Sequence, residues 1–165
     1  MTAPPPYARI ALLAAAFTLV AGCGFRLQGR APLPGVLANV YLQTEDTQTD
    51  FVASLRRSLI ASGARVVREP DDASAIVRIL EDRATRRVLS VSASNIPREY
   101  EITYSVRYEV AAQDRELLPA QDLANTRAFS FDERVLLAKE HEEAILRQAL
   151  AEDLAGAVMR RLSTL

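Results

Sequence analysis

The stretch Tyr100–Val110, YEITYSVRYEV, decides the fold because its apolar and polar residues alternate without a break. Tyr, Ile and Val fill its even-numbered positions, and Glu, Thr, Ser and Arg fill its odd-numbered positions. Successive side chains of a β-strand point to opposite faces, so this pattern predicts a half-buried antiparallel strand with one apolar and one wet face. The row Tyr100, Tyr104 and Tyr108 suits a ligand-stacking platform, but a core-facing strand gives the same spacing, and we adopt the core interpretation.

The flanking segments predict further strands. Upstream, the β-branched run at 73–94 is apolar on both sides at first and becomes polar later, which indicates a strand buried mainly at its start. Downstream, AQDRELLP turns the chain, and Leu117 to Phe131 is expected to return as the hairpin partner. VLANVYLQ at 36–43 predicts a first strand, and ARVVRE at 64–69 a short extended segment.

Two segments have helical spacing. Thr49 or Asp50 is expected to cap a helix that ends at Gly63, with an apolar face made of Phe51, Val52, Leu55, Leu59 and Ile60. A second helix is expected from about Leu137 to Leu162, with a stripe at Leu146, Ala149, Leu150, Leu154, Ala157 and Val158. The sequence therefore predicts an α+β fold, with two helices packed on one face of a four-stranded mixed, mostly antiparallel sheet.

The segment before the fold reads as a leader. Residues 10–21 form an uncharged apolar run after Arg9, followed by small residues, which is typical of a signal peptide and too short for a membrane span. LVAGC at Leu19–Cys23 resembles the lipobox of bacterial lipoproteins, so we expect a signal peptide at 1–22 and acylation of Cys23. Residues 23–35, rich in Gly, Pro and Arg, then form an acylated tether, and 36–165 a single domain.

Composition excludes some classes of function. The formal net charge is −1, which argues against a generally basic nucleic-acid binder. The single cysteine leaves no disulfide within the chain, so stability must come from packing. Gly24 rather than Asp follows Cys23, and by resemblance to lipoproteins of double-membraned bacteria this implies a lipid-anchored protein on the periplasmic side of the outer membrane.

Several pieces together resemble the lipopolysaccharide-assembly lipoprotein family, LptE, the partner of the outer-membrane barrel LptD. They are CGFRLQGRAPLP after the lipobox, REYEITYSVRYEV at Arg98–Val110, and FSFDERVLLAKEHEEAILRQAL at Phe129–Leu150. The resemblance implies a plug in the lumen of an LptD-like barrel, which assists barrel assembly and helps deliver lipopolysaccharide to the outer leaflet. A polar strand face suits that role because the interiors of outer-membrane barrels are polar.

The resemblance also implies lipopolysaccharide-binding residues. Lys139 matches a lysine of the family at the start of the last helix. The second basic residue of the family falls near Ala93 or Ser94, where this chain departs from the pattern, and Arg98, Arg86 and Arg87 are the candidates to replace it. With Arg83, these cations can form a positive rim for phosphates and carboxylates, or a solvated edge neutralised by Glu81, Asp82 and Glu99.

The sequence shows no catalytic constellation. The only histidine, His141, lacks the second histidine that a zinc-binding helix requires, and no glycine-rich phosphate loop or nucleophile elbow occurs. We therefore expect a non-enzymatic protein without a metal or cofactor. Two alternatives stay open at this point: an accessory lipoprotein of another envelope lipid-transport or cell-wall machine, and a periplasmic hydrolase that uses His141 as a general base.

Overall fold

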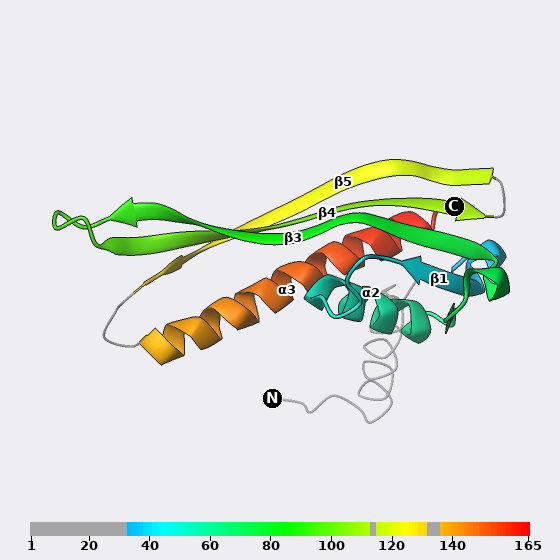
Figure 1. The fold of residues 1–165 in the computed structure, drawn as a ribbon, viewed down its shortest axis with the longest axis horizontal. Helices are drawn as coiled ribbons and strands as arrows, with labels where there is room; N and C mark the ends of the chain where they lie inside the picture. Colours follow the sequence, from blue (N-terminus) through cyan, green and yellow to red (C-terminus); the bar gives the residue numbers. More distant parts are fainter. Residues whose placement is uncertain (1–32, 113–114, 132–135) are drawn as a thin grey trace, which may run out of the picture. The chain divides into compact units, whose positions relative to one another are not determined.

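The structure is a computed structural model that describes residues 33–112, 115–131 and 136–165. Its five strands form one sheet in the order β2-β1-β3-β4-β5 (Figure 1). The elements are the 3-10 helix η1 (Gly35–Leu37), β1 (Asn39–Gln43), α2 (Asp50–Ala61), β2 (Arg65–Val67), the 3-10 helix η2 (Pro70–Asp72), β3 (Ala75–Val91), β4 (Pro97–Ala112), β5 (Arg115–Ser130) and α3 (Leu136–Leu162). The predicted signal peptide, Cys23 and the tether up to residue 32 lie outside the described residues.

The α+β prediction is confirmed, with one strand more than expected. The extra strand is β2, a three-residue edge strand that lies where the sequence indicates a short extended segment. It pairs parallel to β1, and β1 also pairs parallel to β3, so α2 is the crossover of a parallel β1–α2–β2 unit. The predicted first strand begins three residues late, because Pro34 starts a 3-10 turn in which Leu37 N–H donates to the Pro34 carbonyl at 2.9 Å.

The alternation in β4 gives the predicted strand with one buried apolar face. Ile102, Tyr104, Val106, Tyr108 and Val110 are all at most 3% exposed and face the helices. β4 lies between β3 and β5 and pairs antiparallel with both along nearly its whole length. The expected hairpin partner is β5, which begins two residues earlier than predicted, at Arg115. The core interpretation of the tyrosines is confirmed for Tyr104 and Tyr108, whereas Tyr100 is half-buried.

A β-bulge at Leu80 reverses the facing of β3. Before it, Val77 and Ile79 point to the core, and Ile79 lies opposite Tyr108. After it, Asp82 lies opposite Val106 and Arg86 opposite Ile102, so the even-numbered residues now share the face that carries the helices. An extra residue in one strand shifts the alternation by one, and an unbroken reading of the sequence misses that shift.

Both helices lie on one face of the sheet, as predicted (Figure 1). Thr49 caps α2 by accepting a hydrogen bond from Val52 N–H at 3.1 Å, and Gly63 follows the helix with φ of 92°, a backbone conformation that glycine adopts without strain. Phe51, Val52, Leu55 and Leu59 are fully buried. Ile60, which was assigned to the same apolar face, is instead 57% exposed.

Helix α3 has two different halves. Leu150, Leu154, Val158 and Leu162 are buried, but no side chain from Lys139 to Ala149 is. We call residues 83–105, 123–131 and 136–149 the arm, and the remaining described residues the base. In Figure 1 the β3–β4 hairpin of the arm extends past the beginning of α3. Among the described residues, no helix combines the length and the apolar character that crossing a membrane requires.

Candidate functional site

The arm carries all four predicted lipopolysaccharide-binding residues. Arg86 follows the Leu80 bulge and therefore lies on the face that carries α3. Its guanidinium lies 4.8 Å from the centre of the Tyr100 ring, and its Nη1 lies 2.6 Å from Glu143 Oε2 on α3. The half-exposed Arg86 side chain thus joins the sheet to the first half of the helix through one stacking contact and one ion pair.

The Tyr100 ring under Arg86 belongs to a cluster of three aromatic rings. Tyr100 stacks on Phe129 with ring centres 5.9 Å apart, and it meets Phe131 edge-on at 5.1 Å. Tyr100 and Phe129 lie opposite each other in the β4–β5 register, so the stacking follows from strand pairing. Phe129 and Phe131 thus hold the Tyr100 ring on which the Arg86 guanidinium lies.

Lys139 and Arg98 lie near the beginning of α3. The Lys139 side chain is only 16% exposed, and its Nζ lies 2.7 Å from Glu142 Oε2 and 3.5 Å from Ser130 Oγ. Arg98 is exposed and is the extra residue of the third irregularity in the β3–β4 register. Its backbone carbonyl accepts a hydrogen bond from Phe131 N–H at 2.7 Å, which fixes it beside the end of β5.

Arg87 lies on the other face of the sheet. It is opposite Glu101 in the register, and its Nε lies 2.5 Å from Glu101 Oε1. Adjacent strand residues point to opposite faces, so Arg86 and Arg87 do not belong to one continuous rim. Arg83 has a looser partner, Glu81, at 3.7 Å. Carboxylates therefore neutralise all four of the cations Arg83, Arg86, Arg87 and Lys139. Of the three acids expected to do so, Glu81, Asp82 and Glu99, only Glu81 forms one of these pairs.

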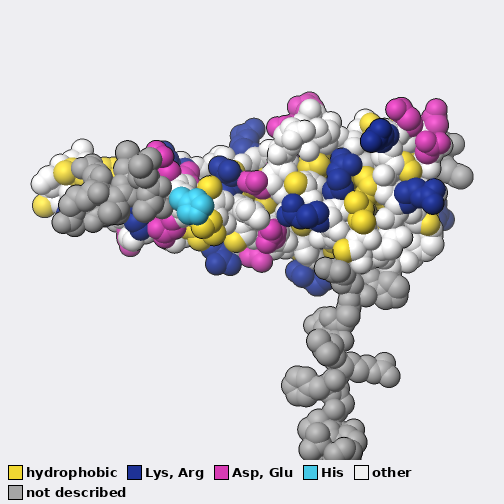
Figure 2. All heavy atoms as spheres, turned by 90° about the horizontal axis from the view of Figure 1, so that it is seen from below, with side chains coloured by type: hydrophobic (Ala, Val, Ile, Leu, Met, Phe, Trp, Pro, Cys, Tyr) yellow, Lys and Arg dark blue, Asp and Glu magenta, His cyan; other side chains and the backbone are white. Residues whose placement is uncertain are grey.

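Acidic and basic side chains alternate over the helix side of the molecule. Figure 2 views that side, where blue Lys and Arg groups lie between magenta Asp and Glu groups and yellow apolar ones. Two further ion pairs tie the arm and the base together there: Arg147 Nε lies 2.7 Å from Asp50 Oδ2, and Arg127 Nη2 lies 3.3 Å from Asp153 Oδ2. The hydrogen bond from Arg147 to Asp50 raises the pKa of Arg147.

The face of β3, β4 and β5 that points away from the helices is polar. Thr103 and Thr126 join their hydroxyls across β4 and β5 at 3.1 Å, and Arg107 Nε lies 3.7 Å from Asp122 Oδ1. No described helix packs on this face. It matches the wet face that the alternation predicts, and it now extends over three strands.

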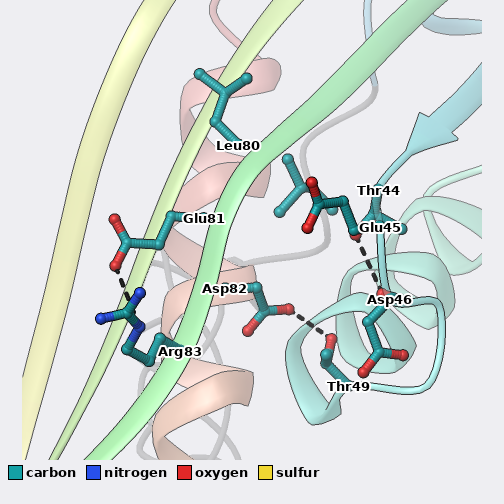
Figure 3. A pocket seen from close by; sticks show the side chains of 9 residues that line it. Thr44, Glu45, Asp46, Thr49, Leu80, Glu81, Asp82 and Arg83 are labelled. Atoms are coloured by element: carbon teal, nitrogen blue, oxygen red, sulfur yellow. Dashed lines mark hydrogen bonds and ion pairs between the residues drawn. The ribbon is translucent and has the colours of Figure 1, made fainter.

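Sequence analysis missed the partly buried carboxylate of Asp82. It lines a pocket of about 230 Å³ between β3 and the loop before α2, together with Thr44, Glu45, Asp46 and Thr49 (Figure 3). Thr49 Oγ1 donates to Asp82 Oδ2 at 2.5 Å, while Asp82 Oδ1 is buried and has no hydrogen-bond partner among the described residues. The sequence signal was an acid at an apparently exposed position, and only the bulge turns it inward.

Burial raises the pKa of Asp82, and the hydrogen bonds from Thr49 and Tyr104 oppose that rise only in part. Burial likewise raises the pKa of Tyr104, and the neighbouring Asp82 raises it further. The Tyr104 hydroxyl also accepts a hydrogen bond from Phe51 N–H at 3.3 Å. Asp82 and Tyr104 therefore link the sheet to the first turn of α2. Their geometry does not resemble that of a nucleophile and its general base.

His141 is exposed on α3, as are Glu140 and the nearby Ile145. A general base needs a position within hydrogen-bond reach of a bound substrate. His141 lines neither the Asp82 pocket nor a second pocket, which lies between β5 and α3 and is lined by Asn125 and Arg160 among others. Among the described residues, no group of three His, Cys, Asp or Glu side chains is placed to hold a metal ion.

Comparison with known proteins decides the family. The sequence model described as "LptE: Lipopolysaccharide-assembly" matches residues 37–162. The chain belongs to the LptE family. The curated relatives include the "LPS-assembly lipoprotein LptE" of Pectobacterium atrosepticum, 27% identical over 93% of this chain and 84% of that protein. The protein of the same name from Yersinia enterocolitica is 28% identical over 92% of this chain and 73% of that protein.

Solved structures of other lipoproteins share this fold. Lipoprotein B of Nitrosomonas europaea shares 29% identity and a TM-score of 0.69, over 85% of this chain and 90% of that chain. A minor lipoprotein from Acinetobacter baumannii shares the fold, with a TM-score of 0.65 at 20% identity over 81% of this chain and 94% of that chain. The LptE family consists of lipopolysaccharide-assembly lipoproteins and is not an enzyme family.

Proposed function

We propose that this protein is a non-enzymatic outer-membrane lipoprotein that plugs an LptD-like β-barrel. In that role it assists assembly of the barrel and helps deliver lipopolysaccharide to the outer leaflet. Membership of the LptE family over residues 37–162 is the observation that carries the proposal. The anchor is Cys23, acylated after removal of residues 1–22, and residues 23–35 tether the domain at 36–165 to the periplasmic side of the outer membrane.

The polar sheet face supports the plug role. A soluble domain buries one face of its sheet, and the opposite face of β3–β5 carries Thr103, Ser105 and Thr126 together with paired charges. Such a surface makes hydrogen bonds with the polar side chains that line a barrel lumen, and it loses no apolar contact when it does so.

Lys139, Arg98, Arg86 and Arg87 are the proposed lipopolysaccharide contacts. Arg86, Arg87 and Lys139 already pair with carboxylates, so phosphate binding requires an exchange of partners. The exchange costs little for the exposed Arg86 and Arg87, because exposed ion pairs contribute only about 0–1 kcal/mol each. A phosphate then gains because the guanidinium donates two parallel hydrogen bonds to it.

Purification of the acylated protein from outer membranes tests the proposal. We expect a large β-barrel protein to be recovered in a one-to-one amount. Recovery of another envelope complex, or of nothing, would refute the plug role and leave the family assignment intact.

Charge reversal then tests the lipid contacts. Lys139→Glu and Arg86→Glu should weaken lipopolysaccharide binding several-fold while the barrel still co-purifies. Arg57→Glu is the matched control, because Arg57 forms an exposed ion pair with Glu152 in the base at 3.5 Å. Equal effects of the arm and base variants would show that only the overall charge matters.

A further inference from the structure

The tip of the β3–β4 hairpin is an uncharged and apolar end of an otherwise charged surface. The ten residues from Val88 to Pro97 include no Asp, Glu, Lys or Arg, although a quarter of the whole chain is charged. Four large apolar side chains are exposed there: Val88 at 47%, Leu89 at 44%, Val91 at 51% and Ile96 at 39%. Contiguous exposed apolar groups of this kind mark a surface that meets an apolar partner.

Irregular pairing holds these side chains outward. Val88 lies opposite Tyr100 and Ser90 opposite Glu99, so Leu89 is an extra residue on β3. Val91 lies opposite Pro97, so Arg98 is an extra residue on β4. Bulges at strand ends change the direction of side chains, and here two of them lie in succession next to the turn.

Three backbone N–H groups of the turn already have partners within it. Ser92 N–H donates to the Ile96 carbonyl at 2.7 Å, and Asn95 N–H donates to the Ser92 carbonyl at 2.9 Å. Ile96 N–H donates to Ser92 Oγ at 3.1 Å, and Asn95 adopts the left-handed conformation that asparagine tolerates, with φ of 61°. These bonds fix the turn and hold the two strand ends together next to the exposed apolar side chains.

Arginines border the apolar tip. Arg87 precedes it and Arg98 follows it, both exposed, and Arg86 lies one residue further along β3. An apolar end bordered by cations matches an amphiphile that carries acyl chains next to anionic groups. The polar lumen of a barrel offers no equivalent partner for the four apolar side chains.

We propose that this tip, Val88–Pro97, contacts the acyl chains of lipopolysaccharide while the neighbouring arginines contact its phosphates. The inference rests on the proposed function, because lipopolysaccharide is taken as the lipid that passes this protein. It adds apolar residues to a contact so far made of cations. It also assigns the acyl chains of lipopolysaccharide to the apolar residues and the phosphates to the arginines.

The experiment compares a variant of the tip with a control at a similarly exposed leucine of the base. The tip variant combines Leu89→Thr and Val91→Thr, which keep a strand-favouring residue at both positions. The control is Leu80→Thr, because Leu80 is 47% exposed and also lies at a bulge of β3, but in the base. Circular dichroism and the midpoint of unfolding confirm that all the proteins are folded.

Two probes separate acyl chains from phosphates: purified lipopolysaccharide, and the same lipopolysaccharide after complete removal of its acyl chains. The tip variant should bind intact lipopolysaccharide about tenfold more weakly than the unchanged protein and the deacylated form equally well. Leu80→Thr should change neither affinity. Equal affinity of the tip variant and the control for intact lipopolysaccharide, or an equal loss on both probes, would overturn the proposal.

Two further results identify the source of a failure. Binding of the unchanged protein to phosphatidylglycerol vesicles as tightly as to lipopolysaccharide would overturn the choice of lipid. No binding of the unchanged protein to either lipopolysaccharide probe would overturn this proposal together with the direct lipid contact. The plug role would then still be decided separately, by co-purification with the barrel.

Discussion

The base and the arm share the strands β3, β4 and β5 and the helix α3, but they are stabilised differently. In the base, α2 and the second half of α3 bury Phe51, Leu55, Leu150 and Val158 completely. In the arm, the first half of α3 is joined to the sheet by the Arg86–Glu143 pair, and a cluster of aromatic rings packs beside it. Burial of large side chains contributes more free energy than exposed ion pairs, so the base supplies the stability and the arm remains open to partners.

The largest expected effect comes from breaking the base. Phe51→Ala removes a fully buried ring at the start of α2, where its own backbone N–H bonds to Tyr104. We expect a loss of about 3–5 kcal/mol in the free energy of unfolding, because a cavity replaces the ring. Urea denaturation followed by circular dichroism measures it. Ile60→Ala, on the exposed side of the same helix, should lower the free energy of unfolding by less than about 1 kcal/mol. A similar loss in both variants would contradict the claim that buried side chains of the base supply the stability.

A smaller effect is expected from breaking the arm. Tyr100→Ala removes the ring that stacks on Phe129 and lies under Arg86. We expect a loss of about 1–2 kcal/mol, since Tyr100 is only half-buried. Amide hydrogen exchange should become faster in the arm part of β4 and stay unchanged near Tyr108. Equal acceleration in both regions would show that the arm and the base unfold together.

The smallest effect lies at the boundary, at Asp82. Its pKa is raised in the folded protein, so the protonated form is favoured there, and the associated stability is present at low pH and lost as the pH rises through the folded pKa. Asp82→Asn removes the buried charge, and the variant should melt above the unchanged protein at pH 7. The difference should shrink as the pH falls and the Asp82 carboxylate of the unchanged protein becomes protonated. A melting temperature lowered at pH 7 would show that the Thr49 bond needs the carboxylate.

Local patterns were enough to predict the main strand and both helices. The unbroken alternation of β4 and the spacing of Phe51, Val52, Leu55 and Leu59 each require only one segment of chain. The family was recognised from LLAKEHEE and the segments at Cys23 and Arg98, and the match over 37–162 confirms it.

Features that depend on pairing were not predictable. The Leu80 bulge brings Asp82 and Arg86 to the helix side, and no local signal marks that extra residue. Ion pairs such as Arg86 with Glu143 and Arg147 with Asp50 join residues far apart in the chain, so their partners emerge only from the fold. The strand β2 was too short for its pattern to be distinguished from an extended loop.

Site-specific photocrosslinking in outer membranes tests the central claim most directly. The crosslinker replaces Thr103, on the polar face of the arm, and in a second protein it replaces Ile60, on the exposed side of α2 in the base. The account predicts that the Thr103 position crosslinks efficiently to one large β-barrel protein and that the Ile60 position does so much less. Absence of a barrel adduct at Thr103, with the protein folded and acylated, would contradict the account.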